Sequence, residues 1–478
     1  MTIAKNGISR RGFIGTISGA AALTLLQLDR KAIAGRSPGG RMITDYVGRL
    51  CYNENPLGPS PAALEAIQNE AEMAHRYPDW YAESLVSMLA THYDVSAGRV
   101  TCGVGATEIL RLLAMALCEP GTNVVAPTPS YGQFTSDAQR FGSSVRLANL
   151  DSDHRVDLQA VRDRVDSNTV AVCITNPNNP TATILDPSEL EAFVDDLPPG
   201  VTTIVDEAYY EFVSVEDYPS AIDMVRSDRN VVVVKTFSKV YGLAGARIGF
   251  AVGDSSVIGQ MRSFMLYAMI SRPSLEAAKA ALDDTDHVDA TVELASQTKE
   301  YCFGEFDRMG LEYIPSETNF FMVDCGRSGD WVRGQLATRG IYVRSGWGMQ
   351  NHIRVSTGRM EEMEDFIAAL EDILHQVGAG DELPKPTRTD LYQAYPNPFN
   401  SSTTIKIYLP KTSNSRLEVF DIRGRLVRTL CDRTLGAGEH SFTWNGTNFS
   451  GHSVSSGSYF YRLTVGDDVM TRRMILLK

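Results

Sequence analysis

The middle of the chain alternates short apolar runs with amphipathic segments. Val- and Ile-rich runs cover Thr169–Thr175, Val201–Val205 and Asn230–Phe237, whereas Thr107–Cys118 and Pro187–Val194 have the spacing of helices with one apolar side. Strands that are apolar almost throughout are typical of parallel sheets covered by helices on both faces. The pattern therefore predicts an α/β domain with a mainly parallel sheet, in which ligands bind at the carboxyl ends of the strands.

The pattern changes after residue 378. Residues 379–393 contain several Gly and Pro residues and have the composition of a linker. Residues 394–478 contain short alternating runs such as Thr404–Leu409 and Arg416–Asp421, separated by turn residues. Alternation of this kind indicates antiparallel strands with one buried face, so we expect a small β-sandwich.

The first 34 residues have the pattern of an export signal. An uncharged stretch, residues 15–28, follows Ser9–Ile14 (SRRGFI), and Ala32–Ala34 supplies the small residues that a signal peptidase needs. The segment resembles a bacterial twin-arginine signal cleaved after Ala34, and its apolar stretch is short for a membrane span. We expect an exported protein that is periplasmic, secreted or at the cell surface. The alternative is an N-terminal helix with a chance Arg-Arg pair.

Length, charge and cysteine usage exclude several classes of protein. A chain of 478 residues is expected to form two or more folding units. Its formal net charge of −13, without a cluster of Lys and Arg, argues against a nucleic-acid partner. The seven cysteines show no zinc-ligand spacing, so we expect no metal site and thiols that stay reduced.

Asp206 and Lys239 each follow an apolar strand, which could bring a carboxylate and an amine together at one edge of the sheet. Such a pair can also be a simple ion pair. The segment Thr236–Arg247 (TFSKVYGLAGAR) resembles the SKxxxLAGxR signature of fold-type I pyridoxal 5'-phosphate (PLP) enzymes, and most closely that of histidinol-phosphate aminotransferases. The resemblance implies that Lys239 forms a Schiff base with PLP and then moves a proton, and that Ser238 and Arg247 bind the cofactor.

Two further segments resemble elements of the same family. Val205–Tyr209 (VDEAY) implies that Asp206 keeps the pyridine nitrogen protonated and that Tyr209 donates a hydrogen bond to the ring hydroxyl. Thr175–Thr181 (TNPNNPT) implies that Asn179 contacts the same hydroxyl. The family usually has Gly where this chain has Ala182, which costs about 1 kcal/mol if the position requires a positive φ.

A glycine-containing segment, Gly103–Glu108 (GVGATE), opens a helix with an apolar stripe. Free N–H groups at a helix start suit a phosphate, although an ordinary capped helix has a similar pattern. The resemblance assigns the cofactor phosphate to Ala106, Thr107 and Glu108, and it implies that Tyr131 stacks on the pyridine ring.

Four other matches concern substrate and assembly. The segment Asn53–Ser60 (NENPLGPS) resembles a loop at the mouth of the active site and makes Asn55 a substrate-binding candidate. Tyr77 matches a tyrosine that reaches the cofactor of a neighbouring subunit, which implies a homodimer. Arg354 matches the arginine that binds the substrate α-carboxylate. Arg344 matches one near a distal phosphate, although an arginine on a strand surface is an equal alternative.

Together these matches imply a PLP-dependent transferase fold over residues 35–378, with a small domain of residues 35–70 and 286–378 and a large domain of residues 71–285. The implied reaction is a ping-pong transfer of an amino group between an amino acid, or an amino-alcohol phosphate, and a 2-oxo acid. A related PLP lyase or decarboxylase, and a surface binding protein that has lost catalysis, remain alternatives because fold similarity does not settle function.

The last 85 residues or so also resemble a known family. Tyr395–Asn400, Val419–Gly424, Gly457–Leu463 and Met474–Lys478 are similar to segments of the C-terminal sorting domain of the type IX secretion system. The resemblance implies an immunoglobulin-like domain and secretion machinery as partners. A generic immunoglobulin-like accessory or carbohydrate-binding domain is the alternative.

Overall fold

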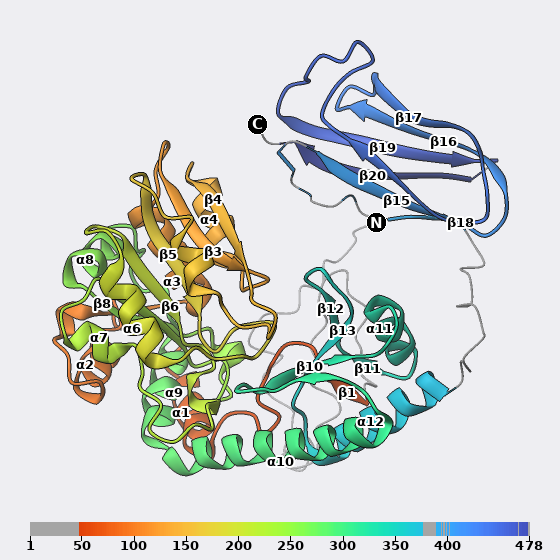
Figure 1. Ribbon diagram of the computed structural model, residues 1–478. Coiled ribbons are helices and arrows are strands. Elements are labelled where there is room, and N and C mark those ends of the chain that lie inside the picture. Colours follow the sequence, from red (N-terminus) through yellow and green to blue (C-terminus); the bar gives the residue numbers. More distant parts are fainter. Residues whose placement is uncertain are drawn as a thin grey trace, which may run out of the picture. The chain divides into compact units, whose positions relative to one another are not determined.

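The computed structural model describes residues 47–375 and, with gaps at 393, 395, 396, 398, 401 and 467, residues 389–476. These residues form two compact units that divide between Leu374 and His375, and each is described by itself (Figure 1). The predicted export signal and most of the predicted linker lie outside the described residues. Across the described part, every helix is too short or too polar to cross a membrane.

A seven-stranded sheet forms the centre of the first unit, in the order β2-β8-β7-β6-β5-β3-β4 (Figure 1). Strands β3 to β7 are parallel to their neighbours, whereas β8 runs antiparallel to β2 and β7. The bounds are β2 Val100–Gly103, β3 Asn123–Thr128, β4 Ser144–Asn149, β5 Thr169–Thr175, β6 Thr202–Asp206, β7 Val231–Thr236 and β8 Gly249–Gly253. The predicted mainly parallel sheet is confirmed, and each of the three predicted strands lies within one residue of an observed one.

Helices cover both faces of this sheet, which explains why its strands are apolar throughout. Val231 and Val233 of β7 pack into one buried cluster, and Val232 and Val234 pack into another on the opposite face. The first cluster includes α2 Glu83–His92, α5 Leu158–Arg162, α6 Pro187–Asp196, α7 Ile222–Arg226 and α9 Arg272–Asp283. The second includes α3 Ala106–Leu117, α4 Gln133–Arg140 and α8 Ser255–Ser263. Three short 3-10 helices lie between these elements: η3 Ala97–Arg99, η4 Tyr210–Phe212 and η5 Ala244–Ala246.

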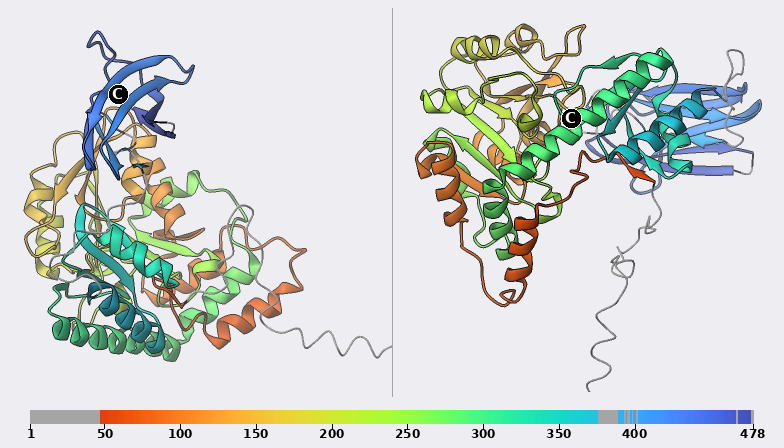
Figure 2. Two further views of the ribbon diagram at one scale, coloured as in Figure 1. Left: turned by 90° about the vertical axis from the view of Figure 1, so that its right-hand side faces the viewer. Right: turned by 90° about the horizontal axis from the view of Figure 1, so that it is seen from below.

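The rest of the first unit is built around a second, smaller sheet (Figure 2). Its antiparallel order is β12-β13-β10-β9, and β1 pairs with β11 in parallel. The strands are β1 Gly48–Arg49, β9 Tyr313–Ile314, β10 Phe320–Asp324, β11 Ile341–Tyr342, β12 Arg344–Gly346 and β13 Met349–Ser356. The helices are α1 Pro61–Ala71, which packs on α9, and α10 Thr285–Met309, α11 Gly329–Thr338 and α12 Met360–His375. The division of this unit at residues 70/71 and 285/286 stays a prediction.

The second unit is an all-antiparallel β domain, in agreement with the predicted sandwich. Two sheets, in the orders β14-β15-β18 and β17-β16-β19-β20, share one buried core that includes Trp444 and Tyr461. The strands are β14 Asp390–Leu391, β15 Thr403–Leu409, β16 Ser413–Asp421, β17 Leu426–Leu435, β18 Gly438–Trp444, β19 Gly457–Val465 and β20 Asp468–Leu476. Both predicted strands lie within β15 and β16, and the buried side chains alternate along them.

Close packing between β8 and α3 sets the position of the start of that helix. Gly105 is the N-cap of α3 and has a φ of 79°, which favours glycine. Gly249 of β8 lies against it, because a Cβ added at 249 would lie only 2.3 Å from the Ala106 nitrogen and 2.6 Å from the Gly105 carbonyl carbon. A side chain at residue 249 would therefore push α3 away from the sheet.

We predict that Gly249→Ala lowers the free energy of unfolding by about 1 to 3 kcal/mol, the usual cost of overpacking a core. Gly259→Ala is the matched control, because Gly259 lies on the exposed side of α8 with open space around it. That substitution should raise the free energy of unfolding by up to about 1 kcal/mol through helix propensity. Urea denaturation of both variants checks this, and equal stability of Gly249→Ala and the parent would contradict the close contact.

Candidate functional site

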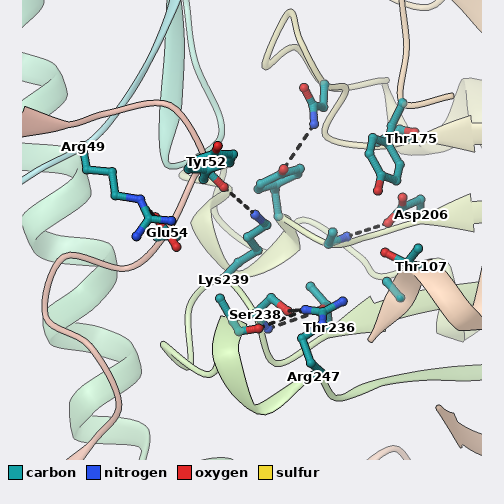
Figure 3. Close-up of a pocket in the computed structure, with 16 residues that line it drawn as sticks. Arg49, Tyr52, Glu54, Thr107, Thr175, Asp206, Thr236, Ser238, Lys239 and Arg247 are labelled. Atoms are coloured by element: carbon teal, nitrogen blue, oxygen red, sulfur yellow. Dashed lines mark hydrogen bonds and ion pairs between the residues drawn. The ribbon is translucent and has the colours of Figure 1, made fainter. Parts of the chain in front are cut away.

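Three parallel strands end in polar residues at the same edge of the large sheet. Thr175, Asp206 and Thr236 are the last residues of β5, β6 and β7, and Lys239 follows three residues later. They line one cavity of about 270 Å³, close to the lower end of the roughly 300–1,000 Å³ typical of ligand pockets. Figure 3 shows the cavity; its lining residues are Arg49, Tyr52, Glu54, Ala106, Thr107, Tyr131, Thr175, Asn179, Asp206, Ala208, Tyr209, Thr236, Ser238, Lys239, Ala244 and Arg247.

Lys239 is held by backbone carbonyls rather than by a carboxylate. Its Nζ donates to the carbonyl oxygen of Tyr52 at 3.0 Å (Figure 3). It also donates to that of Asn53 at 3.1 Å. Burial lowers the pKa of this amine to about 8, and the positive charges of Arg354 and Arg247 act in the same direction. About one amine in ten is therefore uncharged at pH 7, far more than for a lysine of ordinary pKa.

Asp206 faces the same cavity and is only 3% exposed. Its Oδ1 accepts a hydrogen bond of 3.1 Å from the backbone N–H of Ala208. Burial raises the pKa of this carboxyl to about 6, although that hydrogen bond and the Lys239 charge both lower it. A cation placed beside Asp206 would be favoured, because it would compensate a buried negative charge.

The simple ion pair that the sequence left open exists, but it involves a different lysine. Lys235 Nζ lies 3.2 Å from the carboxylate of Glu207 and 3.0 Å from that of Glu211, and Lys235 is buried. Although burial lowers the pKa of Lys235, the two carboxylates raise it well above its ordinary value. Within the described part of the chain, Lys239 has no such carboxylate hydrogen bond. The structure therefore separates an inert lysine from one that can react.

Tyr209, Asn179 and Arg354 form a connected polar network at one side of the cavity. The Tyr209 hydroxyl oxygen accepts from Asn179 Nδ2 at 3.2 Å, and Asn179 Oδ1 accepts from Arg354 Nη1 at 2.6 Å. The Arg354 guanidinium lies between the rings of Phe320 and Trp347, 5.1 Å from each ring centre. Its Nε is buried and has no hydrogen-bond partner among the described residues. This unpartnered N–H can donate to an oxygen of an anionic ligand.

The opposite side of the cavity has the features of a phosphate site. Ala106 and Thr107 are the first residues of α3, where backbone N–H groups are free. Arg247 Nη1 donates to Ser238 Oγ at 3.3 Å, and a Cβ added to Gly105 would lie 2.3 Å from Arg247 Nη2. A helix start, a hydroxyl and a guanidinium thus meet at a point where only glycine fits.

Five of the predicted site residues do not line this cavity. Glu108 accepts a 2.5 Å hydrogen bond from the Val104 N–H, so its carboxylate closes the glycine loop. Asn55 is buried and donates to Val240 O at 2.8 Å and Thr291 Oγ1 at 2.9 Å. Tyr77 is 81% exposed and Arg344 is exposed on β12. Their predicted roles stay predictions. Arg354 does not line the cavity either, but it contacts Asn179, which does, and the other nine predicted residues line the cavity.

Seven lining residues were missed from the sequence. Thr175 and Thr236 end strands, so the rule that predicted Asp206 could have found them. Ala208 and Ala244 lie inside the recognised motifs. Glu54 lies inside the Asn53–Ser60 segment, which the sequence placed at the mouth of the active site. Arg49 and Tyr52 come from β1 and the start of the loop after it, ahead of that segment. They are the part of the cavity that no local pattern indicated; the seven residues are Arg49, Tyr52, Glu54, Thr175, Ala208, Thr236 and Ala244.

The loop after β5 contains a strained position that the sequence indicated. Ala182 has a φ of 64°, so this position does have the positive φ that makes a residue other than glycine strained. A non-glycine residue in this region costs about 1 kcal/mol. Ala182 is fully buried and its N–H donates to Asn178 O at 2.8 Å, so packing and hydrogen bonding hold the loop that presents Asn179.

Known proteins match both units of the chain. Residues 47–370 match the model of the family "Aminotransferase class I and II", and residues 397–468 match that of "FlgD Ig-like domain". Histidinol-phosphate aminotransferase of Moorella thermoacetica is 36% identical over 330 residues, which cover 68% of this chain and 85% of that protein. The enzyme of the same name from Bacillus pumilus is 37% identical over 339 residues, which cover 70% and 92%.

Solved structures agree with these matches. Histidinol-phosphate aminotransferase from Sinorhizobium meliloti, in complex with pyridoxal-5'-phosphate, has a TM-score of 0.65 and 28% identity over 70% of this chain and 92% of that one. L-threonine-O-3-phosphate decarboxylase from Porphyromonas gingivalis has a TM-score of 0.60 and 22% identity over 68% and 99%. The second likeness shows the fold alone. The match over residues 47–370 shows that this chain belongs to the class I and II aminotransferases and is similar to histidinol-phosphate aminotransferases.

Proposed function

We propose that this protein is a PLP-dependent transaminase that transfers an amino group between an amino acid, or an amino-alcohol phosphate, and a 2-oxo acid. The observation that carries the proposal is the cavity lined by both the buried Asp206 and Lys239, which has no carboxylate partner among the described residues. Bound PLP supplies an aldehyde that condenses with amines and a ring that accepts electrons from the substrate Cα. The residues described above meet the requirements of that cofactor.

Lys239 and Asp206 have complementary tasks in this proposal. The lowered pKa of Lys239 leaves part of the amine unprotonated, so it acts as a nucleophile and then moves a proton at the substrate Cα. Asp206 holds a proton on the pyridine nitrogen, because a cation there compensates the buried carboxylate. The start of α3, Ser238 and Arg247 bind the phosphate through N–H, hydroxyl and guanidinium donors.

Two arginines on neighbouring strands support an anionic substrate. Arg354 of β13 and Arg344 of β12 are directly opposite in the antiparallel pairing, and neither has a carboxylate partner among the described residues. Like charges in this position destabilise a sheet unless a ligand compensates them. Arg354 offers its unpartnered Nε to the α-carboxylate. Arg344 then favours substrates that carry a second anionic group, such as a phosphate.

An exposed apolar surface supports the proposed homodimer. Trp80 and Tyr267 lie with ring centres 5.4 Å apart, and the Ala268 N–H donates to Trp80 O at 2.7 Å, so two distant segments share this surface. Large apolar side chains that remain exposed generally mark an interface. We propose that a second copy covers it and that Tyr77 reaches the cofactor of that copy. The surface consists of Tyr77, Trp80, Tyr81, Phe264, Leu266, Tyr267 and Met269, all at least 43% exposed.

We also propose that residues 1–34 direct export and that residues 394–478 act as a sorting domain for type IX secretion. The SRRGFI motif supports the first step. The antiparallel fold of the second unit and its terminal motifs support the second. The match to an immunoglobulin-like domain also fits the alternative of an accessory domain.

We predict that Lys239→Ala lowers kcat for transamination by about 10³-fold or more, because it removes both the nucleophile and the base. The visible absorption of PLP joined to the protein should disappear as well. Lys279→Ala is the control, since Lys279 pairs with Glu276 on α9 away from the cavity. A parent protein that stays colourless with PLP would refute the enzyme, and release of CO₂ from the amino donor would favour the decarboxylase alternative.

We predict that Asp206→Asn stabilises the cofactor-free protein in a pH-dependent way. A carboxyl whose pKa rises from 3.8 to about 6 on folding is uncharged in both the folded and the unfolded state at low pH. As pH rises from the unfolded pKa through the folded pKa, the buried carboxyl lowers the free energy of unfolding. Asparagine avoids this penalty and still accepts from Ala208. The variant should gain up to about 3 kcal/mol at pH 7 to 8 and almost nothing below about pH 3. Urea denaturation against pH checks this, and a gain independent of pH would contradict it.

We predict that Leu266→Asp converts the dimer to monomers, because it places a charge in the apolar interface at a position that is 67% exposed in one chain. Val469→Asp is the control, since Val469 is 60% exposed on β20 of the other unit. Sedimentation velocity should show monomers for the first variant and dimers for the second. Dimers in both would place the interface elsewhere.

A further inference from the structure

Asn53, in the loop between β1 and α1, joins more parts of the site than any motif indicated. It is only 1% exposed and has a φ of 55°. Its carbonyl oxygen accepts from Lys239 Nζ at 3.1 Å and from Asn319 Nδ2 at 3.2 Å. Its side chain lies between Tyr209, to whose hydroxyl Nδ2 donates at 3.0 Å, and Ser356, whose hydroxyl donates to Oδ1 at 2.9 Å.

The hydrogen bonds around Tyr209 have only one consistent set of directions. A guanidinium cannot accept, so Arg354 fixes Asn179 with its oxygen toward Arg354 and its Nδ2 toward Tyr209. Ser356 Oγ accepts from the Asn53 backbone N–H at 2.8 Å, and the Ser356 hydroxyl donates to Asn53 Oδ1 at 2.9 Å. If the Asn53 amide were reversed, the proton of this buried hydroxyl would have no acceptor among the described residues. The Asn53 Nδ2 therefore also faces Tyr209.

Two amide donors thus occupy both lone pairs of the Tyr209 hydroxyl oxygen. The hydroxyl proton cannot point at either amide, and Tyr209 lines the cavity. The proton is consequently directed into the cavity, where it can be donated to a ligand. Without the Asn53 side chain, one lone pair would be empty and the hydroxyl could rotate.

The backbone of Asn53 has a matching effect on Lys239. Successive carbonyls of an extended strand point in opposite directions, yet those of Tyr52 and Asn53 both accept from one amine. The left-handed φ of Asn53 permits this arrangement, and asparagine adopts it more readily than most residues. The same residue therefore sets the place of the amine and the direction of the hydroxyl.

We infer that Asn53 is a positioning residue of this site: it directs the Tyr209 hydroxyl proton to the ring hydroxyl oxygen of the cofactor and holds the Lys239 amine beside it. The inference rests on the proposed function. The hydroxyl proton of Tyr209 and the proton on the Lys239 nitrogen then compete for the same acceptor, the ring hydroxyl oxygen. Loss of the Asn53 side chain weakens Tyr209 as a donor, so Lys239 joined to PLP should keep its proton to a higher pH.

The test is the pH midpoint of the visible absorption of the PLP-loaded full chain. Asn53→Gly keeps the left-handed backbone and both carbonyls and removes only the side-chain contacts. Asn53→Gly should raise the midpoint by somewhat less than about one pH unit, and Tyr209→Phe by about one unit, the size expected for one hydrogen bond. The double variant should match Tyr209→Phe alone, because Asn53 acts through Tyr209. An unchanged midpoint in Asn53→Gly, or shifts that add in the double variant, would overturn the inference.

Ser356→Ala is the second variant and decides the case if Asn53→Gly does not take up PLP. This substitution removes the hydroxyl that donates to Asn53 Oδ1, so the Asn53 amide can reverse and its oxygen can accept the Tyr209 proton. The pH midpoint of the visible absorption should then rise. A midpoint equal to that of the parent protein would overturn the inference. Asp94→Gly is the control, because Asp94 has a left-handed φ of 50° and is exposed outside the cavity. A wild-type protein without visible absorption would reject the proposed function itself, which is a different result.

Discussion

The site depends on an amine that is desolvated but not neutralised. Lys239 donates to two backbone carbonyls, and burial lowers its pKa to about 8. A carboxylate hydrogen-bonded to this amine would hold it in the charged form, which can neither attack an aldehyde nor accept a proton. The buried Asp206 instead faces the cavity that Lys239 also lines, where it can compensate a cation on a ligand. The chemistry of the cavity follows from this separation.

The alternation of side chains at the end of β6 produces that separation. Asp206 and Glu207 are adjacent, but Asp206 lines the cavity while Glu207 forms an ion pair with the buried Lys235. Lys235 and Lys239 lie four residues apart and come from the same strand and its loop. Lys235 is inert because two carboxylates stabilise its positive charge. Lys239 is reactive because it donates only to backbone carbonyls, which carry no full negative charge.

The network from Arg354 to Asn53 links the substrate side of the cavity to the cofactor side. Arg354 orients Asn179, Asn179 and Asn53 orient Tyr209, and Asn53 also holds Lys239. An anionic ligand on Arg354 would therefore act on groups whose hydrogen-bond directions are already set. Such preorganisation is the main way in which a protein assists a reaction whose electronic steps belong to a cofactor.

Much of the fold and of the site could be predicted from the sequence, because apolar runs define strands and the family motifs are each confined to about a dozen consecutive residues. Strands β5, β6 and β7 of the large sheet, Lys239, Asp206 and the possible strain at Ala182 were all accessible in this way. The contacts of Asn53 were not: they join it to Tyr209, Lys239 and Ser356 at separations of 156, 186 and 303 residues. A side-chain hydrogen bond over such a distance leaves no periodic trace in the chain, so only the tertiary structure decided which residues hold the reactive groups in place.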